Sequence, residues 1–309
     1  MKESTPVGAP FSRRAFLAIS GVIPAAFAQV SVGEPAAEAA PPERTGAKRY
    51  PIGLELYSVR GELTRDLPNT LGTVAKLGYE VVEFYSPYFK WTPSYTKDVR
   101  AQMDDLGLRC YSTHNGFESF TPEENLGHAI ELNQILGTRY VVLASAPGRT
   151  SGVDGWKKLS EQLTAAVEQL KPHGLSAGYH NHQAEWAKLE NGQRIIEVIA
   201  ANTPREFVLQ LDVGTCEEAG ADPVAWVKAN PGRFKTMHLK DWAPGGGTGE
   251  KGYRVLFGEG VTPWKELVAA AQTVGGVEFF LIEQEGSRFS EFETAKRCLD
   301  SWRAMFPKA

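Results

Sequence analysis

Four acidic or imidazole side chains stand at or just after the ends of short apolar segments in the second half of the chain. They are Glu185, Asp212, His238 and Glu283. Carboxylate oxygens together with an imidazole nitrogen form a hard, oxygen-rich ligand set that suits Mn²⁺, Mg²⁺, Co²⁺ or Zn²⁺. Each residue alone also has a structural explanation, since an aspartate at the end of a strand often caps a helix. The coincidence of all four predicts a divalent-metal site.

These side chains can act together only if the fold brings distant segments to one place. Eight short segments of β-branched, aromatic and aliphatic residues are typical of buried strands. The expected strands are Ile52–Tyr57, Val81–Phe84, Arg109–Ser112, Tyr140–Leu143, Ser176–His180, Phe207–Asp212, Lys235–His238 and Glu278–Glu283. Amphipathic stretches between them predict helices. Among these are Asn69–Leu77, Trp156–Leu170, Pro263–Val274 and Glu291–Met305.

Alternating strands and helices predict a single-domain α/β fold, a (β/α)₈ TIM barrel over residues 49–309. In such a barrel the C-terminal ends of all the strands form one face, and active sites lie there. Polar residues at the ends of the first and third strands, including Glu55, Tyr57 and His114, would share that face with the metal site. An open doubly wound sheet is the alternative, but no G-x-G-x-x-G follows the first strand.

The chain from Tyr50 to Phe306 resembles the sugar phosphate isomerase/epimerase superfamily, the xylose isomerase-like TIM barrels. The motifs behind the resemblance are Tyr179-His180-Asn181-His182 with Glu185, Leu211-Asp212-Val213-Gly214, His238-Leu239-Lys240-Asp241, Gly258-Glu259-Gly260 and Ile282-Glu283-Gln284. The resemblance implies a metal held by Glu, Asp, His and Glu from the last four strands, which matches Asp212, His238 and Glu283. Many members have Glu at the end of the fifth strand, where this chain has His180. We favour Glu185, reaching back from the loop, as the first ligand, and His180 is the alternative.

The resemblance also implies sugar chemistry, in which the metal polarises a carbonyl and stabilises the enediolate formed when a neighbouring proton leaves. Candidate bases are His180 and His182, because imidazole titrates near neutral pH; either could instead serve as a hydrogen-bonding support. Lys240 is a candidate for holding an oxyanion, with a surface ion pair as its alternative. The remaining expected substrate contacts, which include aromatic rings suited to the C–H surfaces of sugars, are Glu55, Tyr57, His114 and Trp186.

The N-terminal residues have the pattern of an export signal. Arg13-Arg14 precedes an apolar run, Ala15–Val30, which contains the A-x-A sequence Ala26-Phe27-Ala28. This order is typical of a secretory signal, and the paired arginines resemble a twin-arginine signal; a chance arginine pair before an ordinary export signal is the alternative. We expect residues 1–28 to be the signal peptide and residues 29–48, rich in Ala, Pro and Glu, to be a flexible leader. The mature protein would then be periplasmic or secreted.

Composition narrows the class of partner. The 309 residues are 42% hydrophobic and 23% charged, with a net charge of −4, which is ordinary for a globular protein. Nucleic acid is disfavoured as a partner because there is no surplus of basic residues. Three widely spaced cysteines argue against a disulfide framework. We expect a small-molecule sugar as substrate and no stable membrane anchor after signal cleavage; an oligomer is compatible with the sequence.

Together these features predict a divalent-metal-dependent sugar isomerase or epimerase that removes a proton next to a carbonyl. The expected export favours a non-phosphorylated sugar or a keto-sugar, because sugar phosphates are scarce outside the cytoplasm. Two alternatives keep the same site: a keto-glycoside lyase or hydratase, and an exported sugar-binding barrel without catalysis. An endonuclease IV-like barrel would need more metal ligands and contacts to DNA, which the acidic pI of about 5.9 disfavours.

Overall fold

The computed structural model describes residues 49–121, 124–244 and 249–307. The predicted signal peptide and leader, residues 1–48, lie outside the described residues. The described chain begins just before the first strand and ends just after the last helix.

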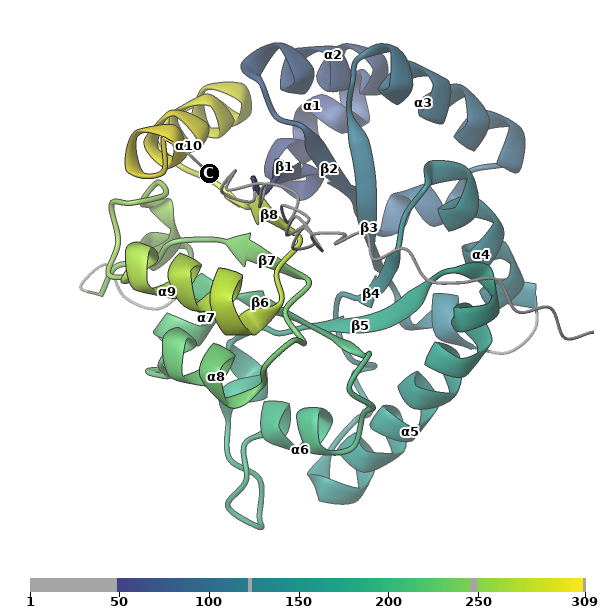
Figure 1. Ribbon diagram of the computed structural model, residues 1–309, viewed down its shortest axis with the longest axis vertical. Helices are drawn as coiled ribbons and strands as arrows, with labels where there is room; N and C mark the ends of the chain where they lie inside the picture. The colour runs from purple at the N-terminus through teal and green to yellow at the C-terminus, as the bar shows by residue number, and fades with distance from the viewer. Residues whose placement is uncertain (1–48, 122–123, 245–248, 308–309) are drawn as a thin grey trace, which may run out of the picture. The chain divides into compact units, whose positions relative to one another are not determined.

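Eight parallel strands close into a barrel in sequence order (Figure 1). The strands are β1 (Ile52–Glu55), β2 (Val81–Phe84), β3 (Arg109–Asn115), β4 (Tyr140–Leu143), β5 (Ser176–His180), β6 (Val208–Asp212), β7 (Thr236–Leu239) and β8 (Phe279–Ile282). The first and last strands pair, with Gly53 beside Leu281, and this pairing closes the barrel. The prediction of a single-domain (β/α)₈ barrel is therefore confirmed.

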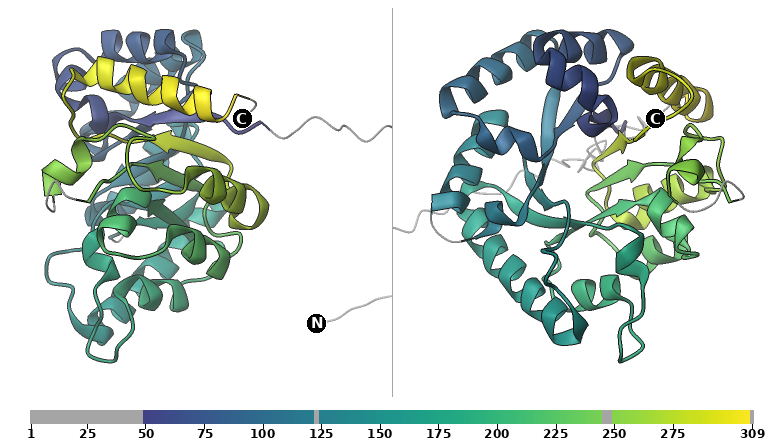
Figure 2. Two further views of the ribbon diagram at one scale, coloured as in Figure 1. Left: turned by 90° about the vertical axis from the view of Figure 1, so that its left-hand side faces the viewer. Right: turned by 180° about the vertical axis from the view of Figure 1, so that it is seen from behind.

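Helices surround the barrel, as the two further views in Figure 2 show. They are α1 (Arg60–Arg65), α2 (Leu67–Leu77), α3 (Pro93–Asp105), α4 (Glu124–Leu136), α5 (Gly152–Leu170), α6 (Ile195–Ala201), α7 (Val213–Glu218), α8 (Pro223–Ala229), α9 (Trp264–Ala270) and α10 (Glu291–Met305). Sequence signals set their ends: Asp66 accepts a hydrogen bond from the backbone N–H of Asn69 at the start of α2. The same helix ends at Gly78, whose φ of 99° favours glycine.

The observed elements differ from the predicted ones mainly at their ends. β3 continues to Asn115, so His114 lies within the strand rather than in the loop that follows it. β1 ends at Glu55, because Leu56–Val59 forms a 3-10 helix. The last turn of the predicted helix Pro263–Val274 winds into a π-helical turn, Ala271–Gly275. These differences matter at His114, because a strand fixes its side chain on one side of the barrel wall.

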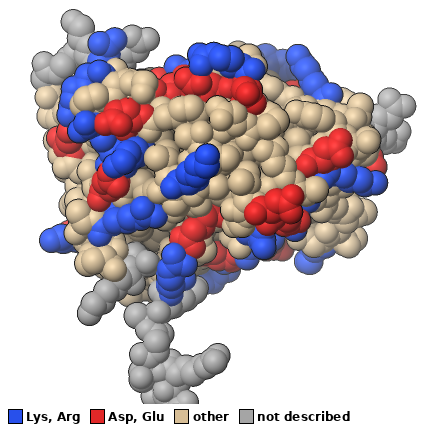
Figure 3. All heavy atoms as spheres, turned by 90° about the horizontal axis from the view of Figure 1, so that it is seen from above, with Lys and Arg blue, Asp and Glu red and all other residues tan. Residues whose placement is uncertain are grey.

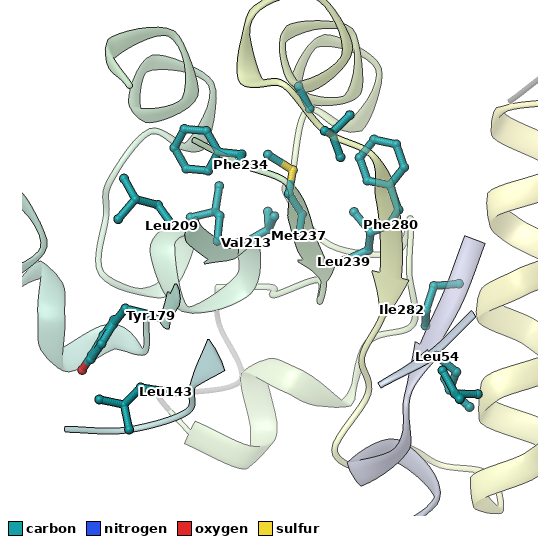
Figure 4. Packing of buried hydrophobic residues seen from close by; sticks show 14 of the residues in the cluster. Leu54, Leu143, Tyr179, Leu209, Val213, Phe234, Met237, Leu239, Phe280 and Ile282 are labelled. Carbon is teal, nitrogen blue, oxygen red and sulfur yellow. The ribbon is translucent and has the colours of Figure 1, made fainter. Parts of the chain in front are cut away.

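Apolar side chains form two clusters, one on each side of the barrel wall. The larger cluster joins the strands to the helices and includes Leu209, Met237 and Phe280 (Figure 4). The smaller cluster contains Val142 and Phe279, and its other members are Val81, Tyr140, Val208 and Leu281. These residues alternate along the strands with those of the larger cluster, so they occupy the barrel interior. The interior is therefore filled with apolar side chains along part of its length, as a barrel without a pore requires.

Among the described residues, no helix is long and apolar enough to cross a membrane. The face seen in Figure 3 carries acidic and basic side chains interspersed with one another. Ion pairs also form within single helices, as between Arg100 and Asp104 in α3.

Candidate active site

The alternation that fills the barrel interior with apolar residues places polar side chains at its C-terminal end. Along β6 the interior positions are Val208, Gln210 and Asp212, and along β2 they are Val81 and Glu83. In every strand except β4, counting every second residue from the interior positions toward the C-terminal end reaches a polar residue. Polar residues in this layer are Glu55, Glu83, Ser112, His114, His180, Gln210, Asp212, His238 and Glu283, all of them buried.

Strand register brings residues far apart in the sequence into contact within this layer. Asp212 of β6 is the register partner of His238 of β7. His180 of β5 stands beside Gln210 of β6 in the same way. Beyond the end of β8, Glu283 approaches His238, with its Oε2 atom 2.9 Å from Nδ1 of the imidazole. Three of the four predicted metal ligands, Asp212, His238 and Glu283, therefore lie together.

Three groups of side chains have ligand atoms spaced closely enough to share a metal ion. In one of them, single ligand atoms of His180, Asp212 and Glu283 all lie within 4.8 Å of one another. The other two are His114 with His180 and His238, and Glu55 with Glu83 and His114. The groups share members, so they form one continuous cluster of carboxylates and imidazoles rather than separate sites.

Glu185, which we favoured as the first ligand, makes other contacts. Its Oε1 atom accepts a hydrogen bond from the Tyr179 hydroxyl at 2.7 Å. Its Oε2 atom accepts one from the backbone N–H of His182 at 2.8 Å and so caps the 3-10 helix Gln183–Trp186. Both oxygens thus stabilise the loop after β5, and no potential metal-binding group among the described residues includes Glu185. His180 at the end of β5, the alternative first ligand, is the residue that joins the cluster instead.

Glu83 and Gln210 belong to the cluster, although the sequence analysis assigned no role to either. Oε1 of Glu83 lies 2.7 Å from Nε2 of His238. Oε2 of Glu83 accepts hydrogen bonds from the Gln210 amide at 2.9 Å and from the Ser112 hydroxyl. Counting every second residue along each strand from its apolar interior positions would have identified both residues, because each is polar within an otherwise apolar strand.

Gln210 determines which nitrogen of His180 carries a proton. The amide group of Gln210 donates to Glu83, so its oxygen must face the imidazoles. That oxygen lies 2.6 Å from Nε2 of His114 and 3.1 Å from Nδ1 of His180, and as an acceptor it requires a proton on both nitrogens. In a neutral imidazole the other nitrogen then carries a lone pair. For His180 this is Nε2, which lies 3.7 Å from Oδ2 of Asp212.

The charges of the imidazoles differ across the cluster. Burial lowers the pKa of His180 well below its usual value, and His238 and His114 lower it further. Burial likewise lowers the pKa of His114. His238 behaves in the opposite way, because Glu83 and Glu283 outweigh the effect of burial and raise the pKa of its imidazole. His180 is therefore neutral and suited to coordination, whereas His238 balances the charge of two carboxylates.

Lys240 lies over the carboxylates at the end of β7. Its Nζ atom is 3.4 Å from Oδ2 of Asp212 and 3.8 Å from Oε2 of Glu283, and it also contacts Glu285. Burial opposes its charge, but Asp212 and Glu283 outweigh burial and raise the pKa of the ammonium group. Burial also opposes ionisation of Glu283, yet Lys240 and His238 lower its pKa. Lys240 thus remains a proton donor at neutral pH.

Within the cluster, two buried carboxylate oxygens accept no hydrogen bond from the described part of the chain: Oδ2 of Asp212 and Oε1 of Glu55. A buried carboxylate oxygen without a hydrogen bond is costly unless a cation or a proton donor lies beside it. Oδ2 of Asp212 has the Lys240 ammonium 3.4 Å away and belongs to the group that also contains His180 and Glu283, so this donor set fits a divalent cation. At Glu55, burial followed by the charge of Glu283 raises the pKa, which favours the protonated form.

Two adjoining cavities open over this cluster. The inner one, of about 260 Å³, is lined by Glu55, His114, His180, Glu283 and the residues around them. The outer one, of about 510 Å³, is lined by Lys240 and by residues of the loops after β1, β7 and β8. Tyr57 and His182 line both cavities. Among the predicted substrate contacts, Trp186 lies elsewhere: it is buried against Trp226, with ring centroids 5.4 Å apart, and lines neither cavity.

Asp241 explains the Gly258-Glu259-Gly260 motif. Its Oδ2 atom accepts hydrogen bonds from the backbone N–H groups of Gly258 and Gly260 at 2.9 and 3.0 Å, and from Nε1 of Trp264 at 2.9 Å. A Cβ atom at Gly260 would lie 2.1 Å from Oδ1 of Asp241. The motif therefore holds the loop between β7 and α9 in place and provides no ligand to the cluster.

Comparison with known proteins agrees with this architecture. The family model described as "Xylose isomerase-like TIM barrel" matches residues 71–305. The chain belongs to this family. The xylose isomerase-like family includes sugar isomerases and epimerases. None of the curated protein sequences matches the chain.

Solved structures of other xylose isomerase-like barrels are similar to this one. A sugar phosphate isomerase/epimerase from Parabacteroides distasonis is 26% identical, with a TM-score of 0.70, over 84% of this chain and 98% of that one. D-psicose 3-epimerase from Clostridium cellulolyticum, solved with D-tagatose, is 14% identical, with a TM-score of 0.61, over 82% and 98%. The IOLI protein, solved with a zinc atom, is 16% identical, with a TM-score of 0.59, over 84% and 97%. The last two show similarity of fold.

Proposed function

We propose that this protein is a divalent-metal-dependent isomerase or epimerase acting on a non-phosphorylated sugar or keto-sugar. The observation that carries the proposal is the convergence of His180, Asp212 and Glu283, whose ligand atoms lie within 4.8 Å of one another beside a cavity. Family membership supports the reaction class, since sugar isomerases and epimerases share this barrel.

His180, Asp212 and Glu283 would hold the ion. His238 would complete the predicted set by releasing a proton and exchanging one of its hydrogen bonds to Glu83 or Glu283 for the ion, since a metal-bound imidazole must offer a lone pair. This assignment replaces Glu185 by His180, because both oxygens of Glu185 are engaged in the loop after β5. A bound divalent ion would polarise the sugar carbonyl and stabilise the enediolate that forms when the neighbouring proton is removed. Mn²⁺, Co²⁺, Zn²⁺ and Mg²⁺ all accept such ligands, and two imidazoles favour the first three over Mg²⁺.

Protein side chains around the inner cavity would move the protons. His182 lines both cavities and does not belong to the ligand group, so we assign it the role of base. Lys240 keeps its proton and can stabilise an oxyanion that develops on the substrate. Glu55 lines the inner cavity with one unpaired oxygen, and its protonated form can donate a hydrogen bond to a sugar oxygen.

The charge of the inner cavity favours a neutral sugar. The carboxylates of Glu283 and Glu285 line it. A phosphate group held among them would be repelled, whereas sugar hydroxyl groups can donate hydrogen bonds to carboxylates. The export signal predicted for residues 1–28 supports the same choice, because it would place the protein where sugar phosphates are scarce.

Exchange of substrate hydrogen with solvent tests the reaction directly. The apo-protein is loaded with Mn²⁺ or Co²⁺ in D₂O, and deuterium uptake into a panel of keto-sugars is followed by NMR. We expect deuterium at one carbon next to the carbonyl of at least one sugar, whether or not a final product accumulates. A sugar-binding barrel without catalysis would bind members of the panel without any exchange, and that result would refute the proposed activity.

Glu283→Gln separates catalysis from binding. The substitution removes a charge from the ligand group while keeping the side-chain shape, so we expect turnover to fall by about 100-fold or more. Exposed Glu168 of α5 provides the matched control, Glu168→Gln, which should leave turnover unchanged. If Glu283→Gln only weakened sugar affinity modestly, the protein would be a binding module.

A further inference from the structure

The two cavities over the cluster adjoin each other, and we treat them as the inner and outer parts of one binding region. They share Tyr57, His182 and Glu285. The inner part, about 260 Å³, is lined by Glu55, His182 and the proposed metal ligands His180 and Glu283. Lys240, proposed to stabilise the oxyanion, lines the outer part. The outer part, about 510 Å³, is twice as large and holds none of the groups proposed to remove the proton other than His182 at the junction. The reaction alone does not explain why the larger part exists.

Side chains around the outer part are fixed by contacts within the protein. Arg60 donates hydrogen bonds to the backbone oxygens of Tyr57 and Glu285 at 3.0 and 2.9 Å, and its guanidinium group lies 4.4 Å from the Tyr57 ring centroid. Tyr253 donates its hydroxyl hydrogen to Glu218 at 2.6 Å. The ring of Tyr253 also lies 4.9 Å from Nζ of Lys240. The outer part is therefore preformed, as ligand sites usually are.

The lining of the outer part suits a sugar ring. Two tyrosine rings, those of Tyr57 and Tyr253, offer apolar faces for C–H groups. Hydrogen-bond donors stand around them: the guanidinium of Arg254 and the amide of Gln183. A few polar groups between aromatic surfaces are typical of small-molecule sites, and a volume of 510 Å³ falls within their usual range of about 300–1,000 Å³.

We propose that the substrate is a glycosylated sugar, whose reacting unit occupies the inner part and whose second sugar unit occupies the outer part. This inference rests on the proposed function and specifies the substrate class of the same site. A single sugar would fill only the inner part. A phosphorylated sugar would also reach the outer part, which is lined by Arg60, Lys240 and Arg254, but its phosphate would fill only a small fraction of the 510 Å³.

Binding of matched ketoses to the Mn²⁺-loaded protein tests the proposal. D-fructose serves as the single sugar; turanose, lactulose and isomaltulose carry a second sugar on different fructose oxygens; and fructose 6-phosphate tests for an anion. We expect at least one glycosylated ketose to bind about tenfold more tightly than fructose, because the second sugar can accept hydrogen bonds from a charged group. Fructose 6-phosphate should bind no more tightly than fructose.

Arg254→Ala identifies where the second sugar binds. Arg254 is exposed and lines only the outer part, so its loss should remove most of the tenfold advantage without changing fructose affinity. Arg205→Ala is the control, because Arg205 is also exposed but lies in the loop before β6, at the opposite end of the barrel. Equal losses for fructose and the glycosylated ketoses would overturn the proposal.

The outcomes distinguish this inference from the proposed function. If fructose exchanges its hydrogen with solvent and no glycosylated ketose binds more tightly, the two-unit substrate is refuted and the isomerase activity stands. A stronger gain for fructose 6-phosphate would also refute it, in favour of a phosphorylated substrate. If no ketose of any kind binds or exchanges, the proposed function falls and this inference falls with it.

Discussion

Gln210 shows how one residue sets the chemistry of its neighbours. Its amide is oriented by Glu83, which burial alone would leave neutral but which His114 and His238 keep ionised by lowering its pKa. The amide oxygen then holds a proton on Nδ1 of His180 and leaves Nε2 free. Residues that orient a metal-ligating histidine in this way commonly change metal affinity when they are replaced.

We therefore expect Gln210→Leu to weaken Mn²⁺ binding by about 10- to 100-fold. Titration of the apo-protein with Mn²⁺ measures the affinity, and ¹⁵N NMR of labelled histidines reports whether His180 keeps its proton on Nδ1. Gln162→Ala on the exposed face of α5 is the control. If Gln210→Leu lowered only the free energy of unfolding and left the His180 tautomer and the Mn²⁺ affinity intact, Gln210 would have a purely structural role.

Replacing His180 should weaken metal binding, whereas replacing Glu185 should not. His180→Ala should abolish tight Mn²⁺ binding, because the ring supplies a ligand atom to the group with Asp212 and Glu283. Glu185→Gln should leave Mn²⁺ affinity within a few fold, since an amide can still accept the hydrogen bond from the His182 backbone. Calorimetric titration of both variants measures this. The reverse result would restore Glu185 as the ligand.

At the scale of elements, α7 places a carboxyl group where its charge is disfavoured. Burial raises the pKa of Glu217 to about 7, and Asp241 after β7 and Asp222 at the start of α8 contribute to the shift. In the unfolded chain the pKa of a glutamate is about 4.3. The folded state thus binds a proton more tightly between these two pH values. Protonated Glu217 favours the folded state below about pH 4.3, and that advantage is lost as the pH rises through 7.

Glu217→Gln should remove this pH dependence. Compared with the variant, the natural protein should lose free energy of unfolding between pH 5 and pH 8, which urea denaturation at each pH measures. The exposed Glu161 of α5 provides a matched control, Glu161→Gln. A constant difference between natural protein and Glu217→Gln across this range would contradict the raised pKa.

At the scale of the whole molecule, the cluster links the two halves of the barrel. Glu83 of β2 contacts His238 of β7, 155 positions later in the sequence. A ligand that binds only the folded protein stabilises all of it, by about 2.7 kcal/mol at 100 times its dissociation constant. We expect saturating Mn²⁺ to raise the Tm of the apo-protein, as measured by calorimetry, and Asp212→Ala to remove the increase. Equal Tm values for the natural protein with and without Mn²⁺ would contradict the metal site.

Much of the architecture was predictable from sequence because it depends on local patterns. Short apolar segments between amphipathic ones predicted all eight strands, with β2, β4 and β5 correct to the residue. The barrel rule then placed Asp212, His238 and Glu283 at one end, where they do meet. The ends of β1 and β3 were less predictable, because a 3-10 helix after Glu55 and a longer strand through His114 depend on neighbouring strands.

The order of strands and helices, the class of fold and the general position of the polar cluster follow from this sequence alone, since a period of two or of 3.6 residues acts over short distances. Only the tertiary structure determined that His180 rather than Glu185 joins the carboxylates, and that Glu83 and Gln210 support them. The physical reason is that side-chain partners across a barrel are set by register and by competing hydrogen bonds. Spacing along the chain placed Glu185 near the cluster, but the Tyr179 hydroxyl and the His182 N–H bind both its oxygens.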